Sequence, residues 1–151
     1  MNIRIENRQK KSPINRRQIR SSMARLLRYL GHSDAEVSML LVDDEGIREI
    51  NRSYLQRDYS TNVISFAMRE GPYGQLHPQV LGDIVISVET ACRQGDKGAL
   101  SMTESLSFFM IHGLLHLLGY DHEGVDARDI QRMEEKEDEL FFLLHRFSLQ
   151  R

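Results

Sequence analysis

The segment HGLLHLLGYDH, residues 112–122, carries three histidines in an otherwise mostly apolar run. On an α-helix His112 and His116 lie one turn apart on the same face, so both rings can point at one ion. Gly119 follows at the position where the helix would end in a left-handed residue, a conformation that glycine adopts at little cost. The turn after it can return His122 to the same point. The spacing therefore predicts three imidazole ligands around one divalent metal ion.

Three histidines with an open fourth position are typical of a catalytic zinc site, where the ion activates a water molecule. A closed structural site would need a fourth protein ligand, and no cysteine lies nearby. We therefore expect one Zn²⁺ per chain. Asp121 could replace one of the rings, and either Asp121 or Glu123 could orient a ring or accept a proton from the water. Asp121 is thus a candidate catalytic residue.

The same spacing matches the metalloprotease signature H-E-x-x-H-x-x-G-x-x-H at its three histidines and its glycine. The residue after the first histidine differs. In the signature it is a glutamate that acts as the general base in peptide hydrolysis, and here it is Gly113. This difference argues against a conventional protease and leaves the expected zinc geometry unchanged.

Hydrophobic periodicity predicts the elements that must position these residues. Strands are expected at residues 2–6, 36–42, 62–68 and 80–87. Helices are expected from Ser12-Pro13 to about residue 30, from Asp43 or Asp44 to 54, at about 88–94, from a capping box at 101–104, and at about 125–145. The pattern predicts an α+β (α/β) fold with a single mixed sheet of about four strands packed by about five helices. Without a linker or repeat, residues 1–151 are expected to form one domain.

The charges are unevenly distributed along the chain. Residues 1–28 contain nine Lys or Arg and one acid, a net charge of +8, whereas the other 123 residues contain 11 basic and 21 acidic residues. Arg17, Arg25 and Arg28 fall opposite the apolar stripe of the first helix. This face is either simply solvated or a contact surface for nucleic acid, so these arginines are candidate RNA-binding residues.

The composition also bears on location. A single cysteine excludes an intramolecular disulfide framework and fits a reducing cytosol. The amino terminus lacks the apolar core of a signal peptide, and the longest uncharged run, 105–120, is too short for a comfortable membrane span. We expect a cytoplasmic protein with no membrane partner.

Three segments resemble the YbeY endoribonucleases, bacterial rRNA maturation factors with a metalloprotease-like zinc site. HGLLHLLGYDHE, residues 112–123, matches the family signature H-G-x-L-H-L-x-G-Y-D-H at its fixed positions. INRSYLQRDYSTNVISF, residues 50–66, resembles its N-x-x-Y…D-x-P-T-[DN]-V-[IL]-S-F block, and LGDIVIS, residues 81–87, resembles its L-G-D-I strand. The resemblance runs from about residue 37 through the last helix. It implies a metalloprotease-like fold with the metal bound by His112, His116 and His122.

The resemblance further implies a zinc-dependent, single-strand-type endoribonuclease that acts in 16S rRNA 3′-end maturation and ribosome quality control. The implied partners are rRNA in the small ribosomal subunit, a ribosomal protein and an assembly GTPase. Because aromatic residues make up only 7% of the chain and tryptophan is absent, we expect specificity to come from the ribosomal context and not from base readout.

Two positions in the second block depart from the family. The arginine that usually follows the tyrosine is Leu55, and the usual proline before Thr61 is Ser60. Arg57 could reach a phosphate from the same loop and is a candidate catalytic residue, although it could equally be a solvated loop arginine.

Two alternatives to a nuclease remain open. A metallopeptidase-like hydrolase could use Asp121 or Glu123 in place of the missing glutamate, and Gly113 argues against it. A non-catalytic, zinc-containing ribosome-assembly factor is favoured by Leu55.

Overall fold

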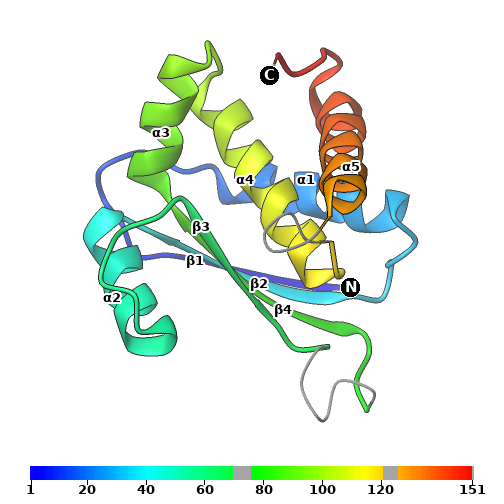
Figure 1. The fold of residues 1–151 in the computed structure, drawn as a ribbon, viewed down its shortest axis with the longest axis horizontal. Coiled ribbons are helices and arrows are strands. Elements are labelled where there is room, and N and C mark those ends of the chain that lie inside the picture. Colours follow the sequence, from blue (N-terminus) through cyan, green and yellow to red (C-terminus); the bar gives the residue numbers. More distant parts are fainter. Residues whose placement is uncertain (70–75, 121–125, 151) are drawn as a thin grey trace.

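The computed structural model describes residues 1–69, 76–120 and 126–150. Four strands form one sheet in the order β1-β2-β4-β3 (Figure 1). Strands β1 (Asn2–Asn7), β2 (Glu36–Val42) and β4 (Val80–Ser87) run parallel, and β3 (Val63–Ala67) pairs antiparallel with β4 at the edge. The five helices are α1 (Arg16–Tyr29), α2 (Asp44–Leu55), α3 (Val88–Lys97), α4 (Met102–Leu117) and α5 (Ala127–His145). The predicted mixed sheet and its helices are therefore confirmed.

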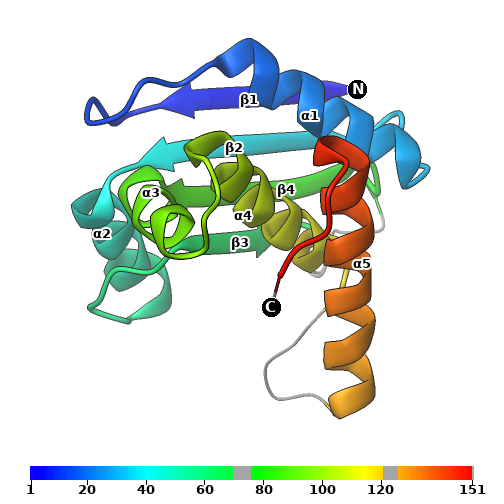
Figure 2. The same ribbon diagram turned by 90° about the horizontal axis from the view of Figure 1, so that it is seen from above.

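The helices are distributed unequally over the two faces of the sheet. Helices α1, α3, α4 and α5 lie on one face and α2 lies on the other (Figure 1). The alternation along β2 explains this arrangement, because Met39 and Leu41 enter the main core while Leu40 and Val42 pack towards Ile47 of α2. Seen from above, α4 crosses the sheet between α3 and α5 (Figure 2). Among the described helices, none is long and apolar enough to cross a membrane.

The first helix begins later than predicted. The expectation of a start at Ser12-Pro13 is wrong, because α1 begins at Arg16 and Asn15 caps it by accepting the backbone N–H of Gln18 at 3.1 Å. Ser12 is held in the preceding loop by the side chain of Gln9, which bonds to both its backbone N–H (2.9 Å) and its carbonyl (2.8 Å). A competing side chain three residues away thus displaces the helix start.

The capping box that starts α4 is confirmed. The Ser101 hydroxyl accepts the N–H of Glu104 at 3.1 Å, and the Glu104 carboxylate accepts the N–H of Ser101 at 2.8 Å. Both bonds satisfy backbone donors that the first turn leaves without a partner. The helix that carries His112 therefore has a well-defined beginning.

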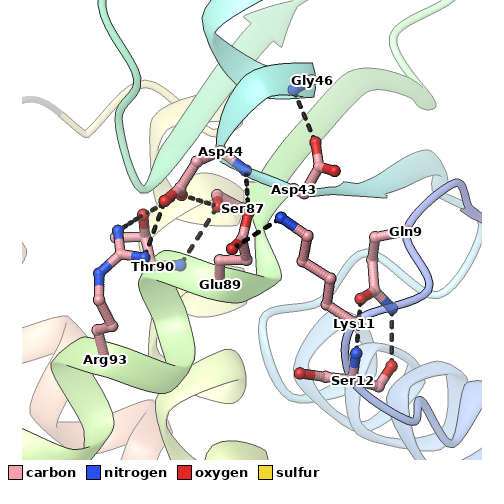
Figure 3. Close-up of polar contacts among 10 residues, drawn as sticks. All are labelled: Gln9, Lys11, Ser12, Asp43, Asp44, Gly46, Ser87, Glu89, Thr90 and Arg93. Carbon is pink, nitrogen blue, oxygen red and sulfur yellow. Dashed lines mark hydrogen bonds and ion pairs between the residues drawn. The ribbon is translucent and has the colours of Figure 1, made fainter.

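Asp44, the first residue of α2, joins that helix to the junction of β4 and α3 (Figure 3). Its carboxylate accepts the hydroxyls of Ser87 and Thr90 at 2.6 Å each and pairs with Arg93 at 2.8 Å. Glu89 accepts the backbone N–H of Asp44 at 2.9 Å. Burial raises the pKa of Asp44, but the hydrogen bonds from Ser87, Thr90 and Arg93, with the Arg93 charge, outweigh it and hold the pKa below its ordinary value. The base of α2 is thereby fixed to the carboxyl ends of β2 and β4.

We predict that Asp44→Asn lowers the free energy of unfolding by about 1–3 kcal/mol at neutral pH, because it replaces an acceptor of three bonds and an ion-pair partner. Since the folded-state pKa lies below the unfolded value of about 3.9, this contribution is present above that value and is lost as the pH falls through the folded pKa. Urea denaturation should show a difference in unfolding free energy between wild type and variant that becomes smaller below about pH 4.

Asp34→Asn is the matched control, since Asp34 is exposed in the turn between α1 and β2. Its unfolding free energy should stay within about 0.5 kcal/mol of wild type. If wild type and Asp44→Asn differed in unfolding free energy as much in acid as at neutral pH, the effect assigned to the Asp44 charge would be contradicted.

Candidate metal centre and active cleft

Two histidines of α4 point towards a common position. The Nε2 atoms of His112 and His116 are 3.1 Å apart, and their rings lie 4.6 Å apart at an angle of 76°. Two nitrogens bound to one tetrahedral ion at about 2.0–2.1 Å would be separated by roughly 3.3 Å. The observed separation thus fits two ligands of a single metal ion.

A buried carboxylate orients the first of these rings. Nδ1 of His112 lies 3.0 Å from Oε2 of Glu137, whose side chain on α5 is only 5% exposed. A neutral imidazole that donates its Nδ1–H to a carboxylate presents the lone pair of Nε2, the atom that approaches His116. The contact therefore selects the ring orientation and the tautomer that a metal ligand needs.

Glu137 is not predicted from the sequence, where only Asp121 and Glu123, the acids beside His122, are candidates for this role. A signal was nevertheless present. Met133 and Leu140 belong to the buried stripe of α5, and Glu137 is buried on that same stripe. A lone acid at a core position of a helix normally has a partner, because an unpaired buried charge is very costly. The partner could not be named, since it lies 25 residues earlier in the chain.

The third expected ligand, His122, and the candidate Asp121 lie in 121–125, outside the described residues. Within 1–69, 76–120 and 126–150, no group of three or more His, Cys, Asp or Glu is placed to hold a metal ion. Gly119 has a φ of +97°, the left-handed conformation expected of it. Its N–H donates to the carbonyl of His116 and that of Tyr120 donates to Leu115, so α4 ends in a Schellman motif. The chain therefore turns away from the helix just before residue 121.

Gly113 is the point at which α4 rests on the sheet. A Cβ atom at this position would lie 2.6 Å from Cγ2 of Ile84 and 3.2 Å from Oγ of Ser65. The Ser65 hydroxyl also donates to the Gly113 carbonyl at 2.9 Å. A glutamate here would point into the sheet, so the protease-type general base has no room in this fold. The glycine that replaces the protease glutamate thus has a packing role that the sequence analysis did not identify.

The histidine pair opens into a cleft of about 790 Å³ between α4, α5 and the loop that joins α2 to β3. Arg57 lines this cleft together with His112 and His116, as does Leu55, the residue at the position of the family arginine. The structure therefore brings the candidate Arg57 into the same cleft as the two histidines. The cleft combines imidazole, carboxylate and guanidinium groups, which suits the cleavage of an anionic substrate.

The other candidate arginines lie elsewhere. Arg17, Arg25 and Arg28 are exposed on α1, outside the residues that line the cleft. Arg25 also donates to the carbonyl of Leu143 at 2.9 Å, which ties α1 to the end of α5. Arg25 therefore has a structural contact in addition to any role in binding.

Comparison with known proteins first identifies the fold. A solution structure of a Thermotoga maritima protein superposes with a TM-score of 0.65 over 94% of this chain and 88% of that one, at 23% sequence identity. At this level of identity the likeness shows a shared fold.

Sequence comparison then identifies the family. The family model described as Endoribonuclease YbeY matches residues 4–145. A Syntrophus aciditrophicus protein named Endoribonuclease YbeY is 51% identical to this chain, over 99% of this chain and 93% of that protein. A Geobacter metallireducens protein of the same name is 46% identical, over 99% of both chains. The chain belongs to the YbeY endoribonuclease family, which confirms the resemblance found in its three motifs.

We predict that Gly113→Ala lowers the free energy of unfolding by about 1–3 kcal/mol, because the new methyl group overlaps the stiff, branched side chain of Ile84. In an open helix interior the same change would stabilise by about 1 kcal/mol, so the sign of the effect distinguishes tight packing from helix propensity. Urea denaturation of the purified variants measures it.

Gly98→Ala provides the control, since a Cβ there would be no closer than 3.5 Å to its neighbours and the backbone φ is −93°. It should change stability by less than about 0.5 kcal/mol. If Gly113→Ala proved as stable as wild type, α4 would not depend on this close approach.

Proposed function

We propose that this protein is a zinc-dependent endoribonuclease of the cytoplasm, folded as one domain over residues 1–151, that acts in 16S rRNA 3′-end maturation and ribosome quality control. The observation that carries the proposal is the pair formed by His112 and His116, oriented by Glu137, in a cleft that also contains Arg57. Membership of the YbeY family supports the reaction class. The donor set supports the metal, because imidazole nitrogen is a preferred ligand of zinc.

The proposed ligands of a single Zn²⁺ are His112, His116 and His122. When bound, the ion would supply a Lewis acid and lower the pKa of a coordinated water. Glu137 would hold His112 in the ligating tautomer and partly balance the charge of the site. Asp121 is proposed as the group that accepts a proton during the reaction.

Arg57 is proposed to bind the phosphate that is cleaved. The planar donors of its guanidinium match two phosphate oxygens at once. Placed in the same cleft as the histidine pair, it would stabilise the negative charge that increases on those oxygens as the bond breaks. Arg57 would thus take the place of the arginine that the family usually has at position 55.

Longer RNA would also contact the basic face of α1. Arg17, Arg25 and Arg28 would form sequence-independent contacts to phosphates and position the RNA. The proposed partners are rRNA in the small ribosomal subunit, a ribosomal protein and an assembly GTPase, all of which follow from the family resemblance.

The proposed activity predicts that wild type cleaves a structured ribosomal RNA fragment, that a chelator abolishes cleavage and that added zinc restores it. His116→Ala should lose both the metal and the cleavage activity. Glu137→Gln should bind zinc about 10- to 100-fold more weakly and regain cleavage at higher zinc concentration. Elemental analysis should find about one zinc per wild-type chain, and casein should remain intact in every sample.

His32→Ala, in the turn after α1, serves as the control and should keep both zinc and activity. Casein cleavage without RNA cleavage would favour the metallopeptidase alternative. Wild type that binds RNA but cleaves neither substrate with any metal would favour the non-catalytic assembly factor. Cleavage by His116→Ala at the wild-type rate would contradict the proposed site.

Replacement of Arg17, Arg25 and Arg28 by glutamine should weaken RNA binding and flatten its dependence on salt. Each lost phosphate contact reduces the magnitude of the slope of log K against log salt concentration by about 0.7–0.9. The loss of three contacts would reduce it by roughly 2–3. The control replaces Lys97, Arg128 and Arg146, which are exposed and carry the same total charge. If both triple variants changed the slope equally, α1 would act only through net charge.

A further inference from the structure

The loop that joins α2 to β3 presents alternate side chains to the cleft. Arg57, Tyr59 and Thr61 line it, whereas the residues between them do not. Asp58 does not line the cleft and pairs instead with Arg48, whose Nε donates to the Asp58 carboxylate at 2.8 Å. Tyr59 is thereby placed on the same side of the loop as Arg57.

The backbone of this loop is anchored by one buried side chain. Asn51 of α2 is 2% exposed, and its Nδ2 donates to the carbonyl of Tyr59 at 3.0 Å. The carbonyl of Asn51 accepts the N–H of Arg57 at 3.2 Å. The backbone of both cleft-lining residues is therefore fixed before any substrate arrives, which reduces the backbone entropy lost on binding.

The Tyr59 ring is available to a ligand. The residue is 53% exposed, and in the part of the chain that the structure describes its ring stacks on no other aromatic group and on no cation. The two phenylalanines that line the cleft, Phe108 and Phe109, already pack against each other with 5.7 Å between ring centroids. An open aromatic face two residues from a guanidinium is the combination with which proteins bind single-stranded RNA, the ring stacking a base and the cation contacting the backbone.

We propose that Tyr59 forms a nucleobase subsite, on which a base next to the cleaved phosphate stacks while Arg57 contacts that phosphate. The inference rests on the proposed endoribonuclease activity of the cleft. A base within an A-form helix has its faces covered by its neighbours, so the subsite requires an unpaired nucleotide. Every base has a π-face, so the subsite selects single strands without reading their sequence.

The test is a double-mutant cycle in which a change in the protein is combined with a change in the RNA substrate. The probe is a single-stranded oligoribonucleotide of about ten nucleotides, together with a set in which each base in turn is replaced by an abasic ribose. Wild type, Tyr59→Ala and Tyr59→Phe are compared by binding titration and by KM and kcat, with zinc content measured for each. Tyr29→Ala is the control, because Tyr29 is 52% exposed on α1 and lies outside the cleft lining.

Tyr59→Ala should weaken binding of the intact oligonucleotide roughly 5- to 150-fold, while Tyr59→Phe and Tyr29→Ala stay close to wild type. One abasic position should weaken binding to wild type by a similar factor and cause no further loss in Tyr59→Ala. Unchanged binding by Tyr59→Ala, or losses that multiply at every abasic position, would overturn the subsite. If wild type bound these oligonucleotides but cleaved none, the proposed activity would fail, and the binding cycle would still decide for or against Tyr59.

Discussion

The close approach of α4 to the sheet at Gly113 is the constraint on which the site depends. Only a residue without a side chain fits between the helix backbone and Ile84, and the Ser65 hydroxyl bonds to the same peptide. This contact fixes both the height and the rotation of α4 above β3 and β4. Because His112 precedes the contact and His116 follows it by less than one turn, both rings are directed by it towards the cleft and not towards the core.

Helix α5 contributes the second contact that positions the site, between Glu137 and His112. Burying a carboxylate such as that of Glu137 is costly in free energy unless it is paired, and His112 is a partner of Glu137 at 3.0 Å. Replacing such a pair by apolar side chains often leaves stability unchanged or improved, so stability alone does not account for its presence here. The contact does what an apolar pair cannot do, since it fixes which nitrogen of His112 faces His116.

The second motif has Leu55 where the family usually has arginine, and the structure shows how Arg57 still reaches the cleft. Leu55 and Arg57 both line the cleft, although only Leu55 occupies the position of the family arginine. Leu55 ends α2 and Gln56 is left-handed with a φ of +55°, so the chain turns between Leu55 and Arg57 and both side chains reach the same cleft. The bonds of Asn51 to the backbone of Arg57 and Tyr59 hold this turn, and Asp44 holds the other end of α2 against β4 and α3.

Features that depend on short spacings could be read from the sequence alone. The shared face of His112 and His116, the strand at residues 36–42, the capping box of Ser101 and Glu104 and the left-handed Gly119 all follow from rules that act within a few residues. The start of α1 shows the limit of such rules, because Gln9 binds Ser12 and leaves Asn15 to cap the helix. Only the tertiary structure decided that Glu137 meets His112, that Gly113 touches Ile84 and that Tyr59 enters the same cleft as the histidines. These contacts join segments whose meeting depends on how whole helices dock on the sheet. Docking is determined by the packing of the entire core, and no local pattern of residues encodes it.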